Sequence, residues 1–442
     1  MAYLHATITH PMLKENIGKS ILMLVLFHFM SCTAQPYLDD FTVENSLDLL
    51  SQYHQTKEVK IQESDSIVIT GSIFKVMLSP NKKNLVIVSN DGRCYITNVS
   101  TGKIVWHFQS QQWMSDRLCE EMSRRANTVF KYYNGNDIHS NHKPSFIPSN
   151  VYELPVFRNQ IRNALFVSDS ILLFLGSFTG VGVDTVSHQS GYTVVNVGGI
   201  VELNLNSHKM SLAFFHYDNP PSPSISKHFV YDSINHQILI GCYNGNAEKN
   251  KIWDSAWTIA RYSMDGQRIK YDILPLPVEH RNNSLGYNFI GGFSAIDEQQ
   301  NIWVSFAFID RLFNISTNNT FPLKIGNENN LSFDHLDKNT VIPSSELIEK
   351  FPISISRIDC INNYIFLVGV FESRNNSSMK NQIQWFFQEY NQKNQELELS
   401  VKIPYYINNR EVRYIIPSKR HMYTLLFDSQ NGWAIAEYEK NK

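Results

Sequence analysis

The residue types that most often carry chemistry gather between positions 130 and 155 of this chain. Asp137, His139 and His142 are close neighbours there, and carboxylate and imidazole groups are common metal ligands. Two histidines in an Asn-rich loop are more often simply solvated, so we expect neither a metal site nor a cofactor. Asp137 and His139 with Glu153 form the one nearby set that could serve a hydrolase or lyase. The set matches no catalytic pattern, so we assign no catalytic residue.

Two adjacent tyrosines, Tyr132 and Tyr133, stand just before this stretch. Flat aromatic side chains can stack on a sugar or a peptide, and their hydroxyl groups then supply a polar handle. Packing of both rings against the domain would explain the pair equally well. We keep Tyr132 and Tyr133 as candidate ligand-binding residues.

Motifs that would announce a specific reaction are missing from the sequence. It contains no Gly-rich phosphate loop, no GxSxG elbow and no HExxH zinc motif. Gly176–Gly182, with the sequence GSFTGVG, is expected between two strands rather than before a helix, so it is not a nucleotide site. A formal net charge of −2 over 442 residues would not steer the chain to nucleic acid.

Four cysteines lie downstream of residue 40, at positions far apart from one another. Cys94, Cys119, Cys242 and Cys360 form no CxxC pair, so the spacing indicates no zinc site. We expect free, buried thiols.

The N-terminal region has the organisation of an export signal. The apolar run Ile21–Met30 follows Lys14 and Lys19 and is too short to span a bilayer comfortably. A basic segment, a short apolar segment and small residues after it are typical of a secretory signal peptide. The tetrapeptide Phe29-Met30-Ser31-Cys32 resembles a bacterial lipobox. Residues 1–32 are therefore predicted to be a lipoprotein signal peptide ending in the lipobox.

Cleavage at this lipobox would leave Cys32 as the first residue, carrying the lipid. Two acyl chains make a stable anchor where one is marginal, so Cys32 predicts a membrane partner and a bacterial cell-envelope location. Thr33 provides no acidic retention signal, which favours the outer membrane. A soluble exported protein cleaved near Ala34 is the alternative, and translation could begin at Met1 or at Met12.

The remainder of the chain repeats one pattern six times, and this pattern predicts the fold. Each copy has a short apolar strand, a tight polar turn and a second, more strongly apolar strand. Aromatic residues make up 12% of the chain, which also favours strands. The first strands of the six copies are Phe74–Leu78, Ala164–Val167, His228–Tyr231, Gly292–Ile296, Ile353–Ile358 and Val412–Ile416.

A third and a fourth strand follow in each copy, except that the last copy ends before its fourth strand. The unassigned segment Val59–Thr70 could supply that strand from the N-terminal side and so close a ring. Four-stranded units repeated around a ring define a β-propeller, here all-β with six blades. The predicted divisions are a linker at 33–58 and the propeller at 59–442, with an insertion at 110–157. A pair of β-sandwiches is the rival architecture.

The insertion after the first copy is expected to contain one small helix. Ser115 can cap its N-terminus, and Leu118 and Met122 fall on one face at helical spacing. We expect this helix to pack on the rim of the ring.

Residues 79–106, SPNKKNLVIVSNDGRCYITNVSTGKIVW, resemble the repeat of WD-type and quinoprotein-type propellers. No copy carries the Trp-Asp ending or the tryptophan pattern of those families. As a whole, the chain resembles the six-bladed, TolB-like or NHL-like lipoproteins of the Bacteroides group. The resemblance covers nearly all of the chain after the signal peptide and rests on structural motifs. It implies a fold and an envelope location, and it implies no particular ligand.

The predicted long segments all connect second to third strands or one blade to the next, so they should project from one face. Binding residues often lie in long loops on a rigid scaffold. The first strand of each blade should line a central channel, and cationic, amide and aromatic residues stand near its mouth at that face. These candidate ligand-binding residues are Arg158, Asn159, Lys227, Tyr287, Asn288 and Arg410.

Such a channel mouth would suit an anionic or hydroxyl-rich ligand, although a water-filled polar lining explains it equally well. We therefore expect an envelope-anchored binding or scaffold module that recognises a glycan, a peptide or a partner protein and forms a monomeric domain. A hydrolase or lyase with its site at the channel mouth is the alternative. A structural lid of a larger envelope complex is a third hypothesis.

Overall fold

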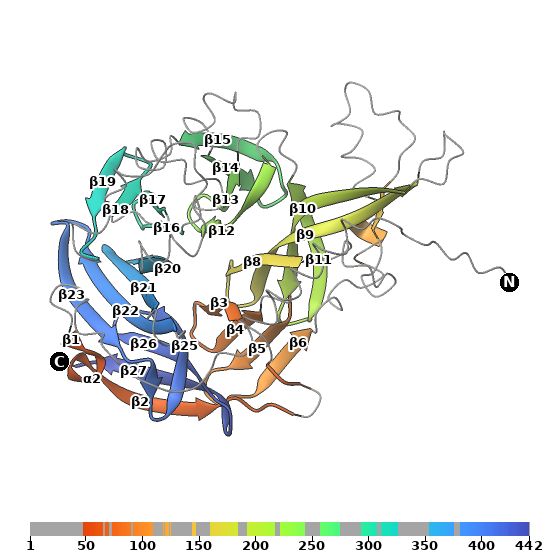
Figure 1. The fold of residues 1–442 in the computed structure, drawn as a ribbon. Helices are drawn as coiled ribbons and strands as arrows, with labels where there is room; N and C mark the ends of the chain where they lie inside the picture. The colour runs from red at the N-terminus through yellow and green to blue at the C-terminus, as the bar shows by residue number, and fades with distance from the viewer. Residues whose placement is uncertain are drawn as a thin grey trace, which may run out of the picture.

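The computed structural model consists of six antiparallel β-sheets arranged around a ring (Figure 1). The structure describes residues 47–64, 67–69, 73–89, 92–108, 118, 120–122, 124, 144–146, 160–183, 192–216, 222–243, 257–274, 293–306, 311–325, 353–374 and 381–441. Each sheet supplies one four-stranded blade, so the predicted six-bladed, all-β propeller is confirmed.

The blades follow one another in chain order, each from its innermost to its outermost strand. Blade 1 contains β3 (Ile73–Leu78), β4 (Asn84–Ser89), β5 (Cys94–Asn98) and β6 (Ile104–Phe108). Blade 2 contains β8 (Gln160–Phe166), β9 (Ile171–Val183), β10 (Tyr192–Asn204) and β11 (Lys209–His216). Blade 3 contains β12 (Ser222–Asp232), β13 (Gln237–Tyr243), β14 (Trp257–Ser263) and β15 (Arg268–Leu274).

The second half of the ring repeats this arrangement. Blade 4 contains β16 (Ser294–Ile296), β17 (Ile302–Ser305), β18 (Arg311–Asn314) and β19 (Asn319–Pro322). Blade 5 contains β20 (Ile353–Ile361), β21 (Tyr364–Arg374), β22 (Asn381–Asn391) and β23 (Glu396–Ile403). Blade 6 contains β25 (Arg410–Pro417), β26 (His421–Asp428), β27 (Gly432–Lys440) and β2 (Tyr53–Lys60).

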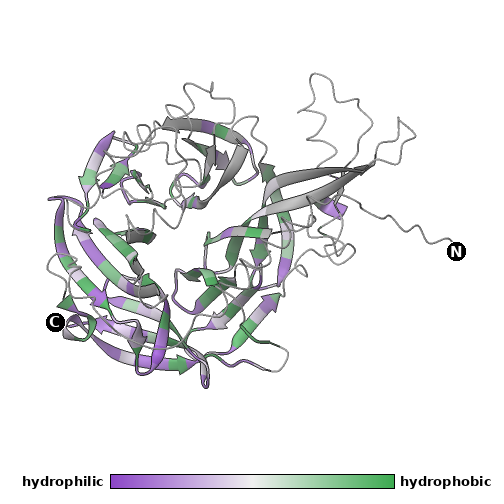
Figure 2. Cartoon of the chain, in the orientation of Figure 1, coloured by the Kyte–Doolittle hydropathy of each residue, from purple (hydrophilic) through white to green (hydrophobic). Residues whose placement is uncertain are grey.

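The ring is closed by the N-terminal strand β2, which pairs antiparallel with the C-terminal strand β27. Tyr53 lies opposite Lys440, and Lys60 lies opposite Ala434. Closure by an N-terminal strand is therefore confirmed, but the strand occupies Tyr53–Lys60 rather than Val59–Thr70. The prediction missed it because the strand is mostly exposed and hydrophilic (Figure 2). An outermost strand is held by its ladder of backbone hydrogen bonds and needs few apolar side chains.

A short N-terminal segment crosses the outside of blade 5 before it reaches blade 6. β1 (Leu47–Asp48) pairs in parallel with the outermost strand β23, and α2 (Leu49–Gln52) follows directly. Leu49 is buried among residues of blades 5 and 6. The chain therefore joins the ring at its periphery.

Apolar clusters fill the spaces between neighbouring blades, because side chains alternate across each strand. On β4, Leu85 and Ile87 pack against blade 6, while Val86 and Val88 pack against blade 2. Corresponding clusters lie between blades 2 and 3, 4 and 5, and 5 and 6. In these five interfaces, the face of each blade is thus buried by the blade beside it.

The predicted small helix after blade 1 is confirmed in its described residues. Leu118, Glu120, Glu121, Met122 and Arg124 are helical. Leu118 and Met122 are 1% and 0% exposed and belong to the apolar cluster between blades 1 and 2. Among the described residues, no helix has the length and apolar character needed to cross a membrane.

Two segments that were predicted to be loops are in fact extensions of strands. β9 and β10 continue past the blade, with Gly176 opposite Gly199 and Val183 opposite Tyr192. The segment Gly176–Gly182 is thus part of a strand, and β7 (Pro144–Phe146) pairs with it. Similarly, β21 and β22 extend into the segment predicted as a loop at 372–382. The sequence did not predict these strands, because they contain glycine and polar residues instead of an apolar pattern. Ladder hydrogen bonds form between backbone groups and do not require apolar side chains.

The turns that join first to second strands and third to fourth strands lie at the other end of the blades. They are short, and several are stabilised by the same kind of hydrogen bond. An Asn or Asp at the end of a strand accepts hydrogen bonds from backbone N–H groups two or three residues later, which stabilises a tight turn. Such residues are Asn98, Asn204, Asp232, Asp297 and Asn314. One end of the ring is therefore trimmed to tight turns.

We expect Gly102 to be critical for ring closure, and Gly92 provides a matched control. Both have positive φ angles, 69° and 83°. A Cβ atom at Gly102 would collide with the carbonyl oxygen of Lys60, at the end of β2, whereas one at Gly92 would meet nothing within 4 Å. Gly92→Ala should cost about 1 kcal/mol through backbone conformation alone. Gly102→Ala should cost about 3 kcal/mol, because the end of the closing strand must also move.

Urea unfolding of the two variants, followed by circular dichroism, measures this difference. Equal losses of unfolding free energy would show that the contact between Gly102 and β2 does not matter for stability.

Candidate functional site

The innermost strands of five blades share a local irregularity next to the ring axis. The register between first and second strands shifts in β3, β8, β12, β20 and β25, and such bulges re-aim the side chains beside them. The first paired residues after the shift are Lys75, Asn163, Phe229, Arg357 and Tyr414. Blades 5, 6 and 1, which are neighbours in the ring, thus contribute a guanidinium, a phenol and an ammonium group at equivalent positions.

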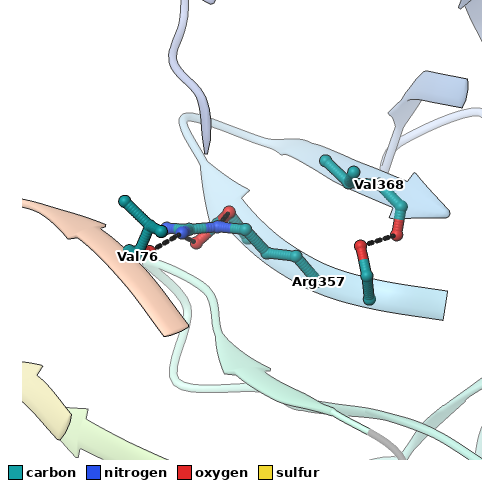
Figure 3. A network of polar contacts seen from close by, with 5 residues as sticks. Val76, Arg357 and Val368 are labelled. Carbon is teal, nitrogen blue, oxygen red and sulfur yellow. Dashed lines mark hydrogen bonds and ion pairs between the residues drawn. The ribbon is translucent and has the colours of Figure 1, made fainter. Parts of the chain in front are cut away.

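Arg357 connects two blades that are not neighbours. Its Nη1 donates a hydrogen bond of 2.9 Å to the carbonyl oxygen of Val76, on the innermost strand of blade 1 (Figure 3). Blade 6 lies between blades 5 and 1, so this bond runs across the inside of the ring.

Asp359, two residues further along β20, holds the guanidinium in place. Its Oδ1 accepts a 3.0 Å hydrogen bond from Nη2 of Arg357, and its Oδ2 accepts one from Nε. This two-pronged pairing is the strong geometry for Arg and a carboxylate. Burial opposes the charge on Arg357, yet the Asp359 carboxylate raises the pKa of Arg357 above its usual value.

Tyr414 of blade 6 completes the connection between blades 5 and 1. It hydrogen bonds with Arg357 and with the backbone of Val76. The residue is 7% exposed, and burial raises the pKa of Tyr414 above 10.0. The phenol therefore stays neutral and can donate its proton in a hydrogen bond.

Lys75 lies beside this network but is not bonded to it. Within the described part of the chain, its ammonium group has no hydrogen-bond or ion-pair partner, although it faces the charges of Arg357 and Asp359. Burial and, next, repulsion by Arg357 lower the pKa of Lys75 to about 8, and attraction by Asp359 opposes this shift. A perturbed lysine beside other charges is a recognised sign of a functional site.

We refer to Lys75, Arg357, Asp359 and Tyr414 as the axial cluster. When Lys75 is protonated, the cluster contains two cations and one carboxylate, so it has a surplus positive charge. The side chains of Arg357 and Asp359 are 18% and 24% exposed, and Lys75 is partly exposed. The cluster is therefore in contact with solvent and not sealed in the core. This arrangement can hold a negatively charged group.

Sequence reasoning did not single out the axial cluster, although all four residues belong to strands or turns that it predicted. Lys75 lies in the apolar strand FKVML, and Arg357 lies in the strand ISISRI. A cation inside an apolar first strand, present in three copies of the repeat as Lys75, Arg357 and Arg413, was the available signal.

One predicted channel-mouth residue, Arg410, is fully described. Asn408 and Asn409 adopt positive φ angles in a two-residue turn, which joins β24 (Tyr406–Ile407) to β25. Nη1 of Arg410, the first residue of β25, lies 3.0 Å from Oε1 of Glu58 on β2. The charge of Arg410 is thus paired with the outermost strand of its own blade.

The other predicted site residues are described less completely or not at all. Lys227 lies in β12, but its side chain is outside the description. The residues that lie outside the described part of the chain are Cys32, Tyr132, Tyr133, Asp137, His139, His142, Glu153, Arg158, Asn159, Tyr287 and Asn288.

The described cysteines agree with the prediction of free thiols. Cys94 is buried and Cys360 is partly buried, and neither forms a disulfide. Burial raises the pKa of each thiol above its usual value, so neither is readily ionised as a nucleophile. Among the described residues, no group of three or more His, Cys, Asp or Glu side chains could hold a metal ion.

The fold defines a class of protein, a six-bladed β-propeller, and the described residues add a net-cationic cluster next to the ring axis. No protein-family model matches the chain, and no curated protein matches it. Its function must therefore be argued from its own residues.

The lowered pKa of Lys75 predicts a specific pH dependence of stability. Between about pH 8 and pH 10.5, the unfolded chain holds the Lys75 proton more tightly than the folded protein does. Stability should therefore rise with pH through this window, as the cost of the charge is relieved. At pH 7, Lys75→Met should stabilise the fold by about 1–2 kcal/mol, because it removes the unfavourable charge. This value is smaller than the full pKa shift implies, because water screens part of the charge.

Urea unfolding at pH 7 and at pH 9.5 tests this expectation. Lys103, which is exposed in a turn of the same blade, supplies the control variant Lys103→Met, which should change little. If Lys75→Met lowers the free energy of unfolding at pH 7, the charge of Lys75 does not destabilise the fold and the prediction is wrong.

Proposed function

We propose that this protein is an exported, membrane-tethered binding or scaffold propeller. In this proposal it recognises a glycan, a peptide or a partner protein at the end of the ring that carries its extended segments. A closed propeller is compatible with such a role, because its blades hold the surrounding loops on a rigid frame.

The observation that carries this proposal is the difference between the two ends of the blades. All the first-to-second and third-to-fourth strand turns are described and short: 79–83, 99–103, 167–170, 205–208, 233–236, 264–267, 297–301, 315–318, 362–363, 392–395 and 418–420. Second-to-third turns and links between blades leave from the opposite end of an antiparallel sheet. Decoration of one end only is typical of a scaffold that presents one binding surface.

The clearest extension at that end is the paired segment Ser177–Val183 with Tyr192–Gly198, which we call the β9–β10 arm. Its backbone ladder is continuous from the blade outwards, and β7 adds a third strand to it. Figure 1 shows the arm projecting well beyond the ring. We propose that this projecting arm contacts the ligand or partner.

The proposed tether at Cys32 is compatible with the path of the N-terminal segment. Leu47 pairs with Val401 on the outermost strand of blade 5, so the described chain begins at the periphery of the ring. A lipid attached upstream would then hold the ring by its outer edge and leave both ends of its axis open. We place this anchor in a bacterial outer membrane.

Replacing the β9–β10 arm tests the proposed binding end. Leu175 and Ile200 are paired across the ladder, so substituting Asn-Gly for Gly176–Gly199 joins them by a two-residue hairpin turn. We expect the variant to keep its circular dichroism spectrum and to lose binding on glycan arrays and in capture from envelope fractions.

A variant at the trimmed end provides the control. Lys393→Ala combined with Asn394→Ala changes an exposed turn there and should leave binding intact. Binding that survives loss of the arm but fails in the control variant would move the binding surface to the other end of the ring.

The tether has its own test in the native host. Cys32 should incorporate labelled fatty acid, and mass spectrometry of the mature protein should find a diacylated Cys32 at the N-terminus. Cys32→Ser should abolish labelling, whereas Cys94→Ser should not, because Cys94 is buried in blade 1. A mature N-terminus near Ala34 without lipid would contradict the tether and would indicate a soluble exported protein.

One contact favours the alternative function, a hydrolase or lyase. His228 on β12 and Ser294 on β16 belong to neighbouring blades, and Nδ1 of His228 lies 2.5 Å from Oγ of Ser294. An imidazole bonded to a hydroxyl group can activate it as a nucleophile. We place binding first because His228 is 1% exposed, whereas a catalytic imidazole must also reach the leaving group. A fluorophosphonate probe that labels Ser294, and not a Ser294→Ala variant, would reverse this order.

A further inference from the structure

We infer that the axial cluster binds an oxyanion, a carboxylate or phosphate group of the ligand, between Lys75 and Arg357. This inference rests on the proposed function, in that the ring is treated as a binding scaffold, and it names the chemistry of the group that enters the ring. It assigns a task to Lys75, whose charge the fold itself does not require.

Unused hydrogen-bond donors are the first argument for an oxyanion. A guanidinium group has five N–H donors, and Arg357 uses Nε and Nη2 on Asp359 and Nη1 on Val76. A fourth N–H is directed to Tyr414, so one donor of the guanidinium remains. The three donors of Lys75 have no acceptor among the described residues. An oxyanion supplies several acceptor oxygens at once.

The balance of charge is the second argument. Asp359 compensates only one of the two cations, and Tyr414 is neutral. Among the described residues, the charged groups that act on Lys75 are Arg357 and Asp359 from β20, and Tyr414 from β25 contacts Arg357. A bound anion would neutralise the remaining charge, and it would remove the repulsion between Lys75 and Arg357.

Rigidity of Arg357 is the third argument, because the position of its guanidinium is set before a ligand arrives. Arg357 is fixed by Asp359, by Tyr414 and by a backbone carbonyl across the ring. Lys75 is the next residue to Val76, which accepts the bond from Arg357. A preorganised site loses less entropy on binding than a flexible one. Partial exposure of Arg357 and Asp359 leaves the site open to solvent.

The proposal predicts a link between binding and protonation. An anion favours the charged form of Lys75, so binding should take up a proton near pH 8 and affinity should fall as the pH rises from 7 to 9. Tyr414 stays protonated across this range, because burial raises its pKa. Lys75 is therefore the group expected to set this dependence.

Isothermal titration calorimetry of the full-length protein tests the site at constant ionic strength. The probes are inorganic phosphate, acetate and glucuronate, which separate a phosphate group from a carboxylate and from the carboxylate of an acidic sugar. We expect saturable binding of at least one probe, weakened about tenfold or more in Lys75→Met, a loss of about 1.4 kcal/mol. Lys75→Arg should restore most of the affinity, and Lys103→Met should leave it unchanged.

Three outcomes would overturn the inference: no binding of any probe, equal binding by Lys75→Met, or equal loss in Lys103→Met. A misfolded variant is recognised by its circular dichroism spectrum, and Lys75→Arg then carries the comparison through its shifted pH dependence. The arm-replaced variant should bind the anion as the wild type does. The arm-replaced variant therefore tests the proposed binding end, and Lys75→Met tests the axial site, so the two proposals can fail independently.

Discussion

In five interfaces of this propeller, the apolar face of one blade is buried by the blade beside it. On β4, alternate residues point to opposite neighbours, with Ile87 toward blade 6 and Val88 toward blade 2. A row of such blades would expose apolar surface at both ends, so the ring must close for any blade to be stable. Closure depends on β2, which joins the N-terminal segment to the C-terminal strand β27. Every other feature of the molecule assumes that this ladder is formed.

Closure also explains how charged residues come to lie inside the ring. The interblade clusters bury the faces of the sheets. The innermost strand of each sheet lies next to the ring axis. In β3 and β20, a charged residue directly follows the bulge next to the axis. Lys75 and Arg357 can therefore stand in otherwise apolar strands without entering an apolar cluster. The contact from Arg357 to Val76 then links blades 5 and 1 directly.

The architecture could be predicted from the sequence because it is local and repeated. A hairpin with apolar strands and an Asn or Asp turn recurs six times, and repetition compensates for weak signals in single strands. The position of β2 could not be predicted, because its stability comes from backbone hydrogen bonds to β27 rather than from its own side chains. The β9–β10 arm was missed for the same reason, since Gly176–Gly182 pairs through its backbone. Of the predicted channel-mouth residues, Arg410 is paired with Glu58 on the outermost strand.

The axial cluster was beyond sequence reasoning for a different reason, which also bears on its role. Arg357 and Val76 are 281 positions apart, and no pattern within one copy of the repeat indicates a contact across the ring. Such a contact exists only once the ring is closed, and so does the field that lowers the pKa of Lys75. Arg357 has a structural explanation, because it connects two blades and its charge is compensated. Lys75 has none, because its charge costs stability and gains no bond in the described protein. Residues that weaken a fold without a structural return are expected at functional sites, and Lys75 is the residue of this ring that best fits that description.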